Sequence, residues 1–201
     1  MKVFKSVKDT RQKKTKNLFI ITGCSGAGKT TVSFTILPEI LSCKEFINAD
    51  EIARGLSPFQ PEKVSTEAGR IMLHRIDELL EKGEDFAFET TLSARSYTHT
   101  ILKAQEKNYT VTLIFFWLNS VELAKKRVEM RVNEGGHFIP TDVIERRYYA
   151  GLKNLFELYL PICDIAIVYD NSENLNLVFE KLDGGNIEIY DLEKYKLIKN
   201  V

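Results

Sequence analysis

The feature that most constrains this chain is the segment Gly23–Thr30, which has the sequence GCSGAGKT. An apolar run, Leu18–Thr22, comes before it and predicts a buried strand. The residues from Lys29 to about Leu37 predict a helix that stops near Pro38. Because a strand leads into the glycine-rich turn and a helix leads out of it, the segment matches the phosphate-binding P-loop in both motif and context. A chance glycine-rich turn before a helix is the alternative.

The residue types of this segment predict a nucleoside triphosphate and Mg²⁺ as cofactors, and ATP is the triphosphate expected of a kinase. Glycines let the backbone approach phosphate oxygens, and the loop N–H groups with the helix N-terminus favour negative charge. Lys29 is placed to reach the β- and γ-phosphates, and Thr30 offers its hydroxyl to Mg²⁺. The residues expected to hold the nucleotide are Gly23, Ser25, Gly26, Ala27, Gly28, Lys29, Thr30 and Thr31.

The rest of the chain alternates between segments with strand and helix character. Further strands are expected at 45–48, 85–89, 109–118 and 163–169. Helices are expected at about 62–81, 95–107, 120–132 and 142–159. Asp142 and Glu145 have the spacing of a capping box, and a small hairpin with a terminal helical turn is expected around Asn186–Tyr190. The alternation predicts right-handed βαβ units and an α/β fold with a mainly parallel, five-stranded sheet covered on both faces.

Composition favours one water-soluble domain. The chain has 201 residues and 28 charges of each sign, which argues against binding to nucleic acid. Three widely spaced cysteines give no metal-binding pattern, and no apolar run is long enough to cross a membrane. Residues 1–17 form a polar lead-in without the apolar core of a signal peptide, so 18–201 are expected to be one domain in the cytoplasm.

The class of P-loop protein follows by elimination. The switch-type GTPase motifs NKxD and DxxG are absent from the sequence. No apolar strand is expected to end in the Asp that ATP-driven motors use. A three-layer P-loop kinase with a helical lid and a small C-terminal hairpin is therefore the expected fold class.

Two carboxylates are expected to face the P-loop. Asp50 follows the second strand and Glu89 ends the third, and ligands of open α/β sheets bind beyond these strand ends. A kinase acting on an alcohol needs a carboxylate that accepts the hydroxyl proton, and Asp50 fits that role. Glu89 fits a place near the metal, with Thr30. The alternatives are that Asp50 caps a helix from Glu51, and that Glu89 pairs with an arginine.

A helix, a glycine break and a second helix predict a lid at about 127–147. Arg127 and Arg131 lie four apart on one helix, and Arg146 and Arg147 follow the break at Gly135-Gly136. Closure of such a lid brings guanidinium groups onto the transferring phosphoryl group. Surface pairing with Glu129, Glu134 or Glu145 is the alternative. The residues expected to act in catalysis are Lys29, Asp50, Arg131 and Arg146.

Several of these segments, taken in order, resemble the zeta toxin family of P-loop kinases, in particular its chromosomal, stand-alone branch. They are Asn48-Ala-Asp50, then Phe88–Ser93 with Arg95, and then Gly135-Gly-His137 with Arg146-Arg147. Characterised members of the family phosphorylate a sugar hydroxyl of UDP-N-acetylglucosamine or a related nucleotide sugar. The resemblance implies that Asp50 is the general base.

The acceptor site is expected to include residues that follow the third strand. The resemblance implies that Glu89 and Thr91 hold the acceptor, and Arg95 and Glu67 are added to that set. Thr90 stands where the family has glycine, and Ser93 stands where it has a close arginine, so the acceptor pocket is expected to differ from that of other members.

The leading hypothesis is an ATP-dependent kinase for a hydroxyl of a nucleotide sugar. A kinase for nucleosides, nucleotides or polynucleotide ends is the first alternative, and it predicts an acceptor pocket built for phosphate. A non-catalytic nucleotide-binding module is the second, but it does not need a base such as Asp50. An antitoxin protein remains open as a partner.

Overall fold

The computed structural model describes residues 16–136 and 138–200. Of the expected lead-in, residues 1–15 lie outside the described part, and Lys16 and Asn17 already belong to the first strand. The strands are β1 (Lys16–Gly23), β2 (Glu45–Ile47), β3 (Phe86–Thr90), β4 (Tyr109–Trp117), β5 (Ile165–Asp170), β6 (Asn176–Lys181) and β7 (Ile187–Ile189). The α-helices are α2 (Lys29–Thr35), α3 (Ala49–Leu56), α4 (Ser65–Lys82), α5 (Tyr97–Glu106), α6 (Val121–Asn133), α7 (Thr141–Asn154), α8 (Leu160–Ile162) and α9 (Leu192–Lys199).

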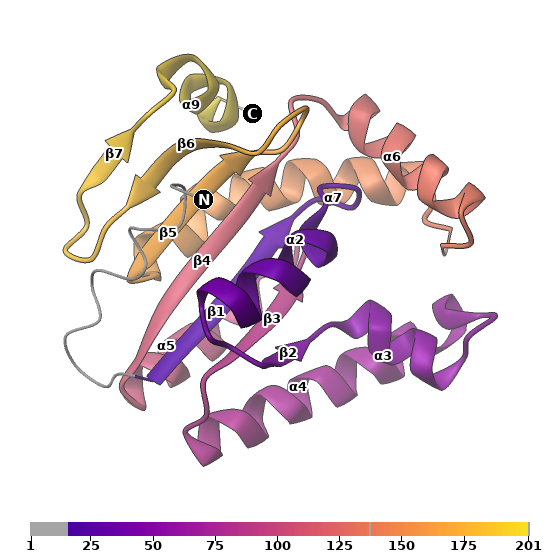
Figure 1. The fold of residues 1–201 in the computed structure, drawn as a ribbon, viewed down its shortest axis with the longest axis horizontal. Helices are drawn as coiled ribbons and strands as arrows, with labels where there is room; N and C mark the ends of the chain where they lie inside the picture. Colours follow the sequence, from indigo (N-terminus) through magenta and orange to yellow (C-terminus); the bar gives the residue numbers. More distant parts are fainter. Residues whose placement is uncertain (1–15, 137, 201) are drawn as a thin grey trace.

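The strands form one mixed sheet in the order β2-β3-β1-β4-β5-β6-β7 (Figure 1). The first five strands in this order are parallel, and β6 and β7 are antiparallel additions. The sheet thus has seven strands instead of the expected five, because the C-terminal hairpin continues the same sheet. Its first strand, β6, was not predicted from the sequence.

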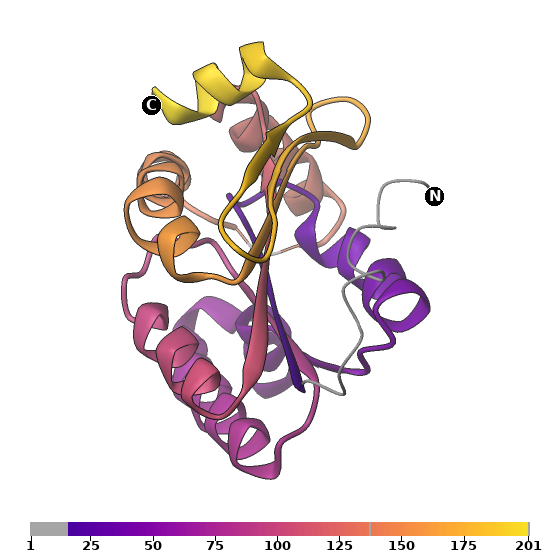
Figure 2. The ribbon, with the colours of Figure 1, turned by 90° about the vertical axis from the view of Figure 1, so that its left-hand side faces the viewer.

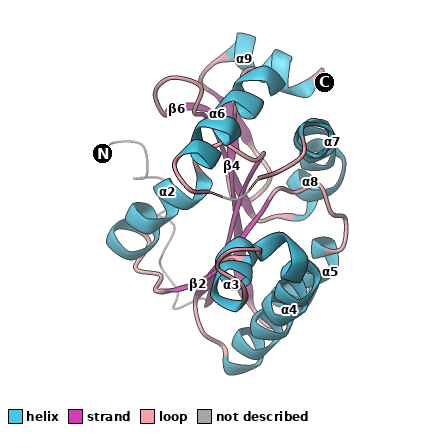
Figure 3. Cartoon of the chain, turned by 90° about the vertical axis from the view of Figure 1, so that its right-hand side faces the viewer, coloured by secondary structure: helices cyan, strands magenta, loops and turns pink. Residues whose placement is uncertain are grey.

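Helices cover both faces of this sheet, as Figures 2 and 3 show with the sheet seen edge-on. Helix α2 lies on one side, and α5, α7 and α8 lie on the other. Every residue of β4 except Thr110 is buried, because strands with helices on both faces lose all contact with water. The expected three-layer α/β sandwich of the P-loop kinase class is confirmed.

The helix after the P-loop was expected to stop near Pro38, but it continues past this residue. The chain continues from α2 into a π-helical turn, Ile36–Ile40, that contains Pro38. Pro38 has no N–H to donate, and the wider turn lets Leu41 N donate to Ile36 O over 3.0 Å. The helix expected to end near Tyr159 is likewise followed directly by α8, which contains Pro161 near its start.

The expected capping box of α7 is also wrong. The N-cap residue is Pro140, and no side chain caps this helix. Glu145 instead forms an ion pair with Lys125 of α6, with 2.6 Å between Oε2 and Nζ, so its side chain links α7 to α6. In contrast, α4 follows a 3₁₀ turn (Pro61–Val64) and ends as expected at Gly83, whose φ of 70° suits a helix C-terminus.

Candidate active site

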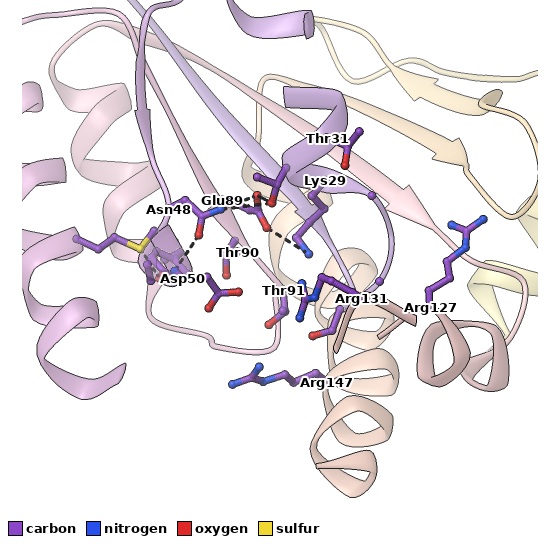
Figure 4. A pocket seen from close by; sticks show the side chains of 17 residues that line it. Lys29, Thr31, Asn48, Asp50, Glu89, Thr90, Thr91, Arg127, Arg131 and Arg147 are labelled. Atoms are coloured by element: carbon purple, nitrogen blue, oxygen red, sulfur yellow. Dashed lines mark hydrogen bonds and ion pairs between the residues drawn. The ribbon is translucent and has the colours of Figure 1, made fainter. Parts of the chain in front are cut away.

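A cavity of about 400 Å³ lies at the carboxyl ends of β1, β2 and β3, between the P-loop, α3 and α7 (Figure 4). It brings together residues from seven separate parts of the chain. The lining residues are Ser25, Gly26, Gly28, Lys29, Thr30, Thr31, Asn48, Ala49, Asp50, Met72, Glu89, Thr90, Thr91, Tyr97, Arg127, Arg131 and Arg147.

The P-loop is packed tightly against the sheet. Gly23 has a φ of +137°, and a Cβ there would lie 2.3 Å from the carbonyl oxygen of Phe116 in β4. Only glycine fits this close approach. Gly23 and the buried Ala27 therefore shape the loop without lining the cavity, whereas the other residues expected to hold the nucleotide do line it.

Glu89 is the centre of a hydrogen-bonded cluster at the floor of the cavity. Its Oε2 accepts hydrogen bonds from Thr30 Oγ1 at 2.7 Å and from Asn48 Nδ2 at 3.0 Å. Its Oε1 lies 3.4 Å from Nζ of Lys29, which also donates to the Cys24 carbonyl at 3.0 Å. Glu89 was expected near Thr30, but no role was predicted for Asn48. The motif Asn48-Ala-Asp50 was the sequence feature that could have indicated one.

This cluster fits Mg²⁺. A hydroxyl and a carboxylate oxygen lie within 2.7 Å of each other at the start of α2, and Mg²⁺ prefers such oxygen ligands. Mg²⁺ usually takes one or two protein oxygens and completes its shell with water and phosphate. Within the described residues no group of three or more His, Cys, Asp or Glu side chains forms a metal cage. The residues present therefore fit a metal shared with a nucleotide.

Asp50 lines the cavity from the first turn of α3. The alternative that Asp50 caps this helix is wrong, because Asn48 is the N-cap and its Oδ1 accepts a hydrogen bond from the Asp50 N–H at 2.8 Å. Asn48 thus joins two regions: its Oδ1 orients the α3 backbone at Asp50, and its Nδ2 holds Glu89.

The expected lid arginines have different environments. Arg131 of α6 points toward Lys29 in the cavity, and within the described residues its buried Nε and Nη2 have no hydrogen-bond partner (Figure 4). Arg127 donates to the carbonyls of Asn171 and Ser172 at 2.9 and 2.7 Å, so it anchors the loop after β5.

Arg146 was expected in the site, but it is exposed and does not line the cavity; Arg147 does. Successive helical residues are rotated by about 100°. The buried stripe of α7, which includes Ile144, Tyr148 and Gly151, fixes which arginine turns inward.

The acceptor side of the cavity departs most from expectation. Thr91 lines it as expected, but Glu67 and Arg95 are exposed and do not. The inward stripe of α4 runs through Ala68, Met72 and Ile76, which turns Glu67 to solvent. Met72 and Tyr97 line the cavity instead, and burial raises the pKa of the Tyr97 hydroxyl. Neither Met72 nor Tyr97 was among the expected site residues.

The residue that follows β5 supports the P-loop, a contact that was not predicted from the sequence. Asn171 Nδ2 donates to the Ala27 carbonyl at 2.8 Å. Strand β5 ends at Asp170, so the expectation that no apolar strand ends in Asp is wrong. Its carboxylate pairs with Lys194 of α9 at 2.8 Å and accepts from Ser172. Burial pushes the pKa of Asp170 upward, but the bonds from Lys194 and Ser172 outweigh it and leave that pKa below its usual value.

Comparison with known proteins decides the family. The sequence profile described as zeta toxin matches residues 2–182. This chain belongs to the zeta toxin family. As a family member with a P-loop kinase fold, it is a phosphotransferase.

Individual proteins are also similar to this chain. An uncharacterized protein of Haemophilus influenzae (strain ATCC 51907 / DSM 11121 / KW20 / Rd) is 30% identical over 126 residues, which cover 63% of this chain and 88% of that protein. Among solved structures, AvrRxo1-ORF1:-ORF2 with ATP has a TM-score of 0.72 at 18% identity, covering 98% of this chain and 67% of that one. A structure of the PezAT chromosomal toxin-antitoxin system of Streptococcus pneumoniae has a TM-score of 0.65 at 19% identity and covers 99% and 92%.

No helix in the described part of the chain combines the length and apolar character that crossing a membrane requires.

Proposed function

We propose that this zeta toxin family member transfers the γ-phosphoryl group of ATP to a hydroxyl of a nucleotide sugar of the UDP-N-acetylglucosamine type. One observation carries the proposal: a single cavity is lined by the P-loop Lys29, by Asp50 and by Arg131, whose buried Nε and Nη2 have no hydrogen-bond partner among the described residues. Buried donors without partners are costly in a folded protein, and a phosphoryl group satisfies them. A nucleotide-binding module without catalysis has no use for Asp50 in this place.

The proposed reaction is an in-line displacement. The acceptor hydroxyl gives its proton to Asp50, its oxygen bonds to the γ-phosphorus, and the bond between that phosphorus and the β–γ bridging oxygen breaks. Lys29 and Arg131 stabilise the negative charge on the transferring group and on the leaving ADP. When bound, Mg²⁺ neutralises phosphate charge, and Thr30 and Glu89 would hold it.

Arg147 is proposed to bind the diphosphate of the acceptor. It lines the cavity from α7, whereas Lys29 and the P-loop backbone serve ATP. A nucleotide sugar brings two phosphates that a neutral sugar lacks, and a guanidinium binds such oxygens bidentately. A kinase for nucleosides, nucleotides or polynucleotide ends is the alternative, and the acceptor assay below includes nucleosides to test it.

Partner and location belong to the same proposal. An antitoxin is a proposed partner, supported by the structural similarity to a toxin-antitoxin system. A cytoplasmic location is proposed because ATP is the donor, and the three cysteines, Cys24, Cys43 and Cys163, are free thiols.

We also propose that 127–147 acts as a lid, since Gly135 and Gly136 separate α6 from α7.

The test is a coupled ATP-turnover assay with UDP-N-acetylglucosamine, other nucleotide sugars, nucleosides and no acceptor. Turnover with a nucleotide sugar should fall at least about 100-fold in Asp50→Asn, since a general base contributes 10²–10⁴-fold. Glu51→Gln is the matched control, because this neighbouring carboxylate on α3 does not line the cavity. ATP affinity should stay within a few-fold in both variants. Near-normal turnover in Asp50→Asn would refute the general-base assignment.

A further inference from the structure

The loop after β3, residues 91–94, has a backbone that needs support. Leu92 is fully buried and has a φ of +62°, in the left-handed region that a branched apolar residue rarely adopts. It directly follows Thr91, which lines the acceptor side of the cavity. A strained residue beside a site persists only where the surrounding structure holds it.

The support comes from α7 and the helical turn that follows it, Leu155–Tyr159. Asn154, which is buried, donates from Nδ2 to the carbonyls of Leu92 at 2.9 Å and Ser93 at 3.2 Å. The hydroxyl of Tyr159 donates to the carbonyl of Ala94. The loop also makes local bonds, from the Leu92 N–H to Thr90 Oγ1 and between the hydroxyls of Thr91 and Ser93.

Gly151 lets the helix approach the same loop. A Cβ at Gly151 would lie 2.7 Å from the carbonyl oxygen of Thr91, a distance at which one of the two must move. Four consecutive carbonyls, from Thr91 to Ala94, therefore face three residues of one helical segment. Arg147 lies one turn before Gly151 on α7, so this helix sets the distance between that cation and the loop.

We propose that Gly151, Asn154 and Tyr159 are positioning residues that set the acceptor side of the site by holding the 91–94 loop. They act on Thr90 and Thr91 through the loop backbone, and they leave the nucleotide side unchanged. The inference rests on the proposed function for the identity of the acceptor. The contacts themselves are independent of that function.

The experiment compares Asn154→Asp, Tyr159→Phe and Gly151→Ala with wild type. Asn154→Asp removes both donors at nearly constant shape, and Tyr159→Phe removes a single hydroxyl. Gly69→Ala is the matched control, because this glycine is also helical and a Cβ there meets nothing within 4 Å. With UDP-N-acetylglucosamine as the probe, we expect the acceptor KM to rise at least about tenfold in Asn154→Asp, because both buried hydrogen bonds to the loop are lost. ATP affinity, titrated without acceptor, should stay within about twofold.

Hydrogen–deuterium exchange gives a readout that does not depend on the acceptor. Amides of residues 91–96 should exchange faster in Asn154→Asp and Tyr159→Phe, while those of 23–31 keep the wild-type rate. Unchanged exchange at 91–96, or an equal acceleration in both segments, overturns the positioning role. If wild type does not phosphorylate UDP-N-acetylglucosamine, that result refutes the proposed acceptor, and the exchange rates with the ATP affinities still decide the inference.

Discussion

The two halves of the cavity are built in opposite ways. The nucleotide half comes mostly from one run of residues, Gly23–Thr31, with a fixed backbone and glycines where the chain must bend. The acceptor half is assembled from α3, α4, the end of β3, α5 and α7, which are far apart in the sequence. A contiguous motif carries its geometry in the local sequence. An assembled site depends on which faces of several helices turn inward.

Each half is held from outside by an asparagine. Asn171 donates to the P-loop at Ala27, and Asn154 donates to the acceptor loop at Leu92 and Ser93. The first lies at the end of a central strand, and the second lies on a helix that also carries a cavity arginine. The comparison predicts that the two halves can be damaged separately.

The largest effect is expected where the two halves meet, at Arg131. Arg131→Ala should lower kcat roughly 1,000-fold, because an arginine on the transferring phosphoryl group is worth 10³–10⁵ in rate. Arg146→Ala is the control, since this residue is exposed and outside the cavity. Steady-state kinetics with saturating ATP measures both. A loss in Arg146→Ala together with near-normal turnover in Arg131→Ala would mean that α7, and not α6, supplies the phosphoryl contact.

A smaller effect, confined to the nucleotide half, is expected for Asn171→Ala. The buried Ala27 carbonyl loses its donor, so ATP affinity should fall roughly tenfold, the cost of one buried hydrogen bond. The acceptor KM should change less than about twofold. Asn174→Ala, an exposed asparagine in the same loop, is the control. Isothermal titration with ATP and acceptor kinetics separate the two readouts, and a joint loss contradicts the independence of the halves.

The smallest effect concerns stability, at the ion pair between Asp170 and Lys194. Asp170→Asn should lower the free energy of unfolding by about 1–3 kcal/mol near neutral pH, since hydrogen bonds to a charged group are lost. Asp183→Asn, on an exposed turn, should change little.

The pH dependence of this pair has a definite sign. Because the pKa of Asp170 is lower in the folded state, the stabilisation is present above the unfolded pKa of about 3.9 and is lost as the pH falls through the folded value. Chemical denaturation should therefore show the gap between wild type and Asp170→Asn narrowing below about pH 4. A gap that is constant across this range contradicts a charged Asp170.

The sequence predicted the fold more fully than the site. Strands β1 to β5 were expected close to their observed bounds, since each is a short run rich in apolar residues, and β1, β4 and β5 are buried on both faces. Strand β6 was missed. The helical turns through Pro38 and Pro161 were missed as well, because the rule that proline ends a helix overlooks the π-helical turn at Pro38 and the start of a helix at Pro161, where proline is tolerated.

Asp50, Glu89, Arg131 and Thr91 do line the cavity, whereas Glu67, Arg95 and Arg146 do not. Glu67 and Arg146 lie on helices near the site and Arg95 lies in the segment before α5, but all three are exposed to solvent. Sequence spacing alone does not determine whether such a side chain is directed toward the cavity or toward solvent.

By itself, the sequence determined the α/β class, the P-loop and the carboxylates at the strand ends. These follow from local motifs and from periodicity, which neighbouring residues alone decide. Only the tertiary structure decided that Arg147 faces the cavity, that Asn48 links Glu89 to α3, and that the 91–94 loop rests on α7. Such contacts join residues tens of positions apart, so they depend on how packed elements rotate and fill the core.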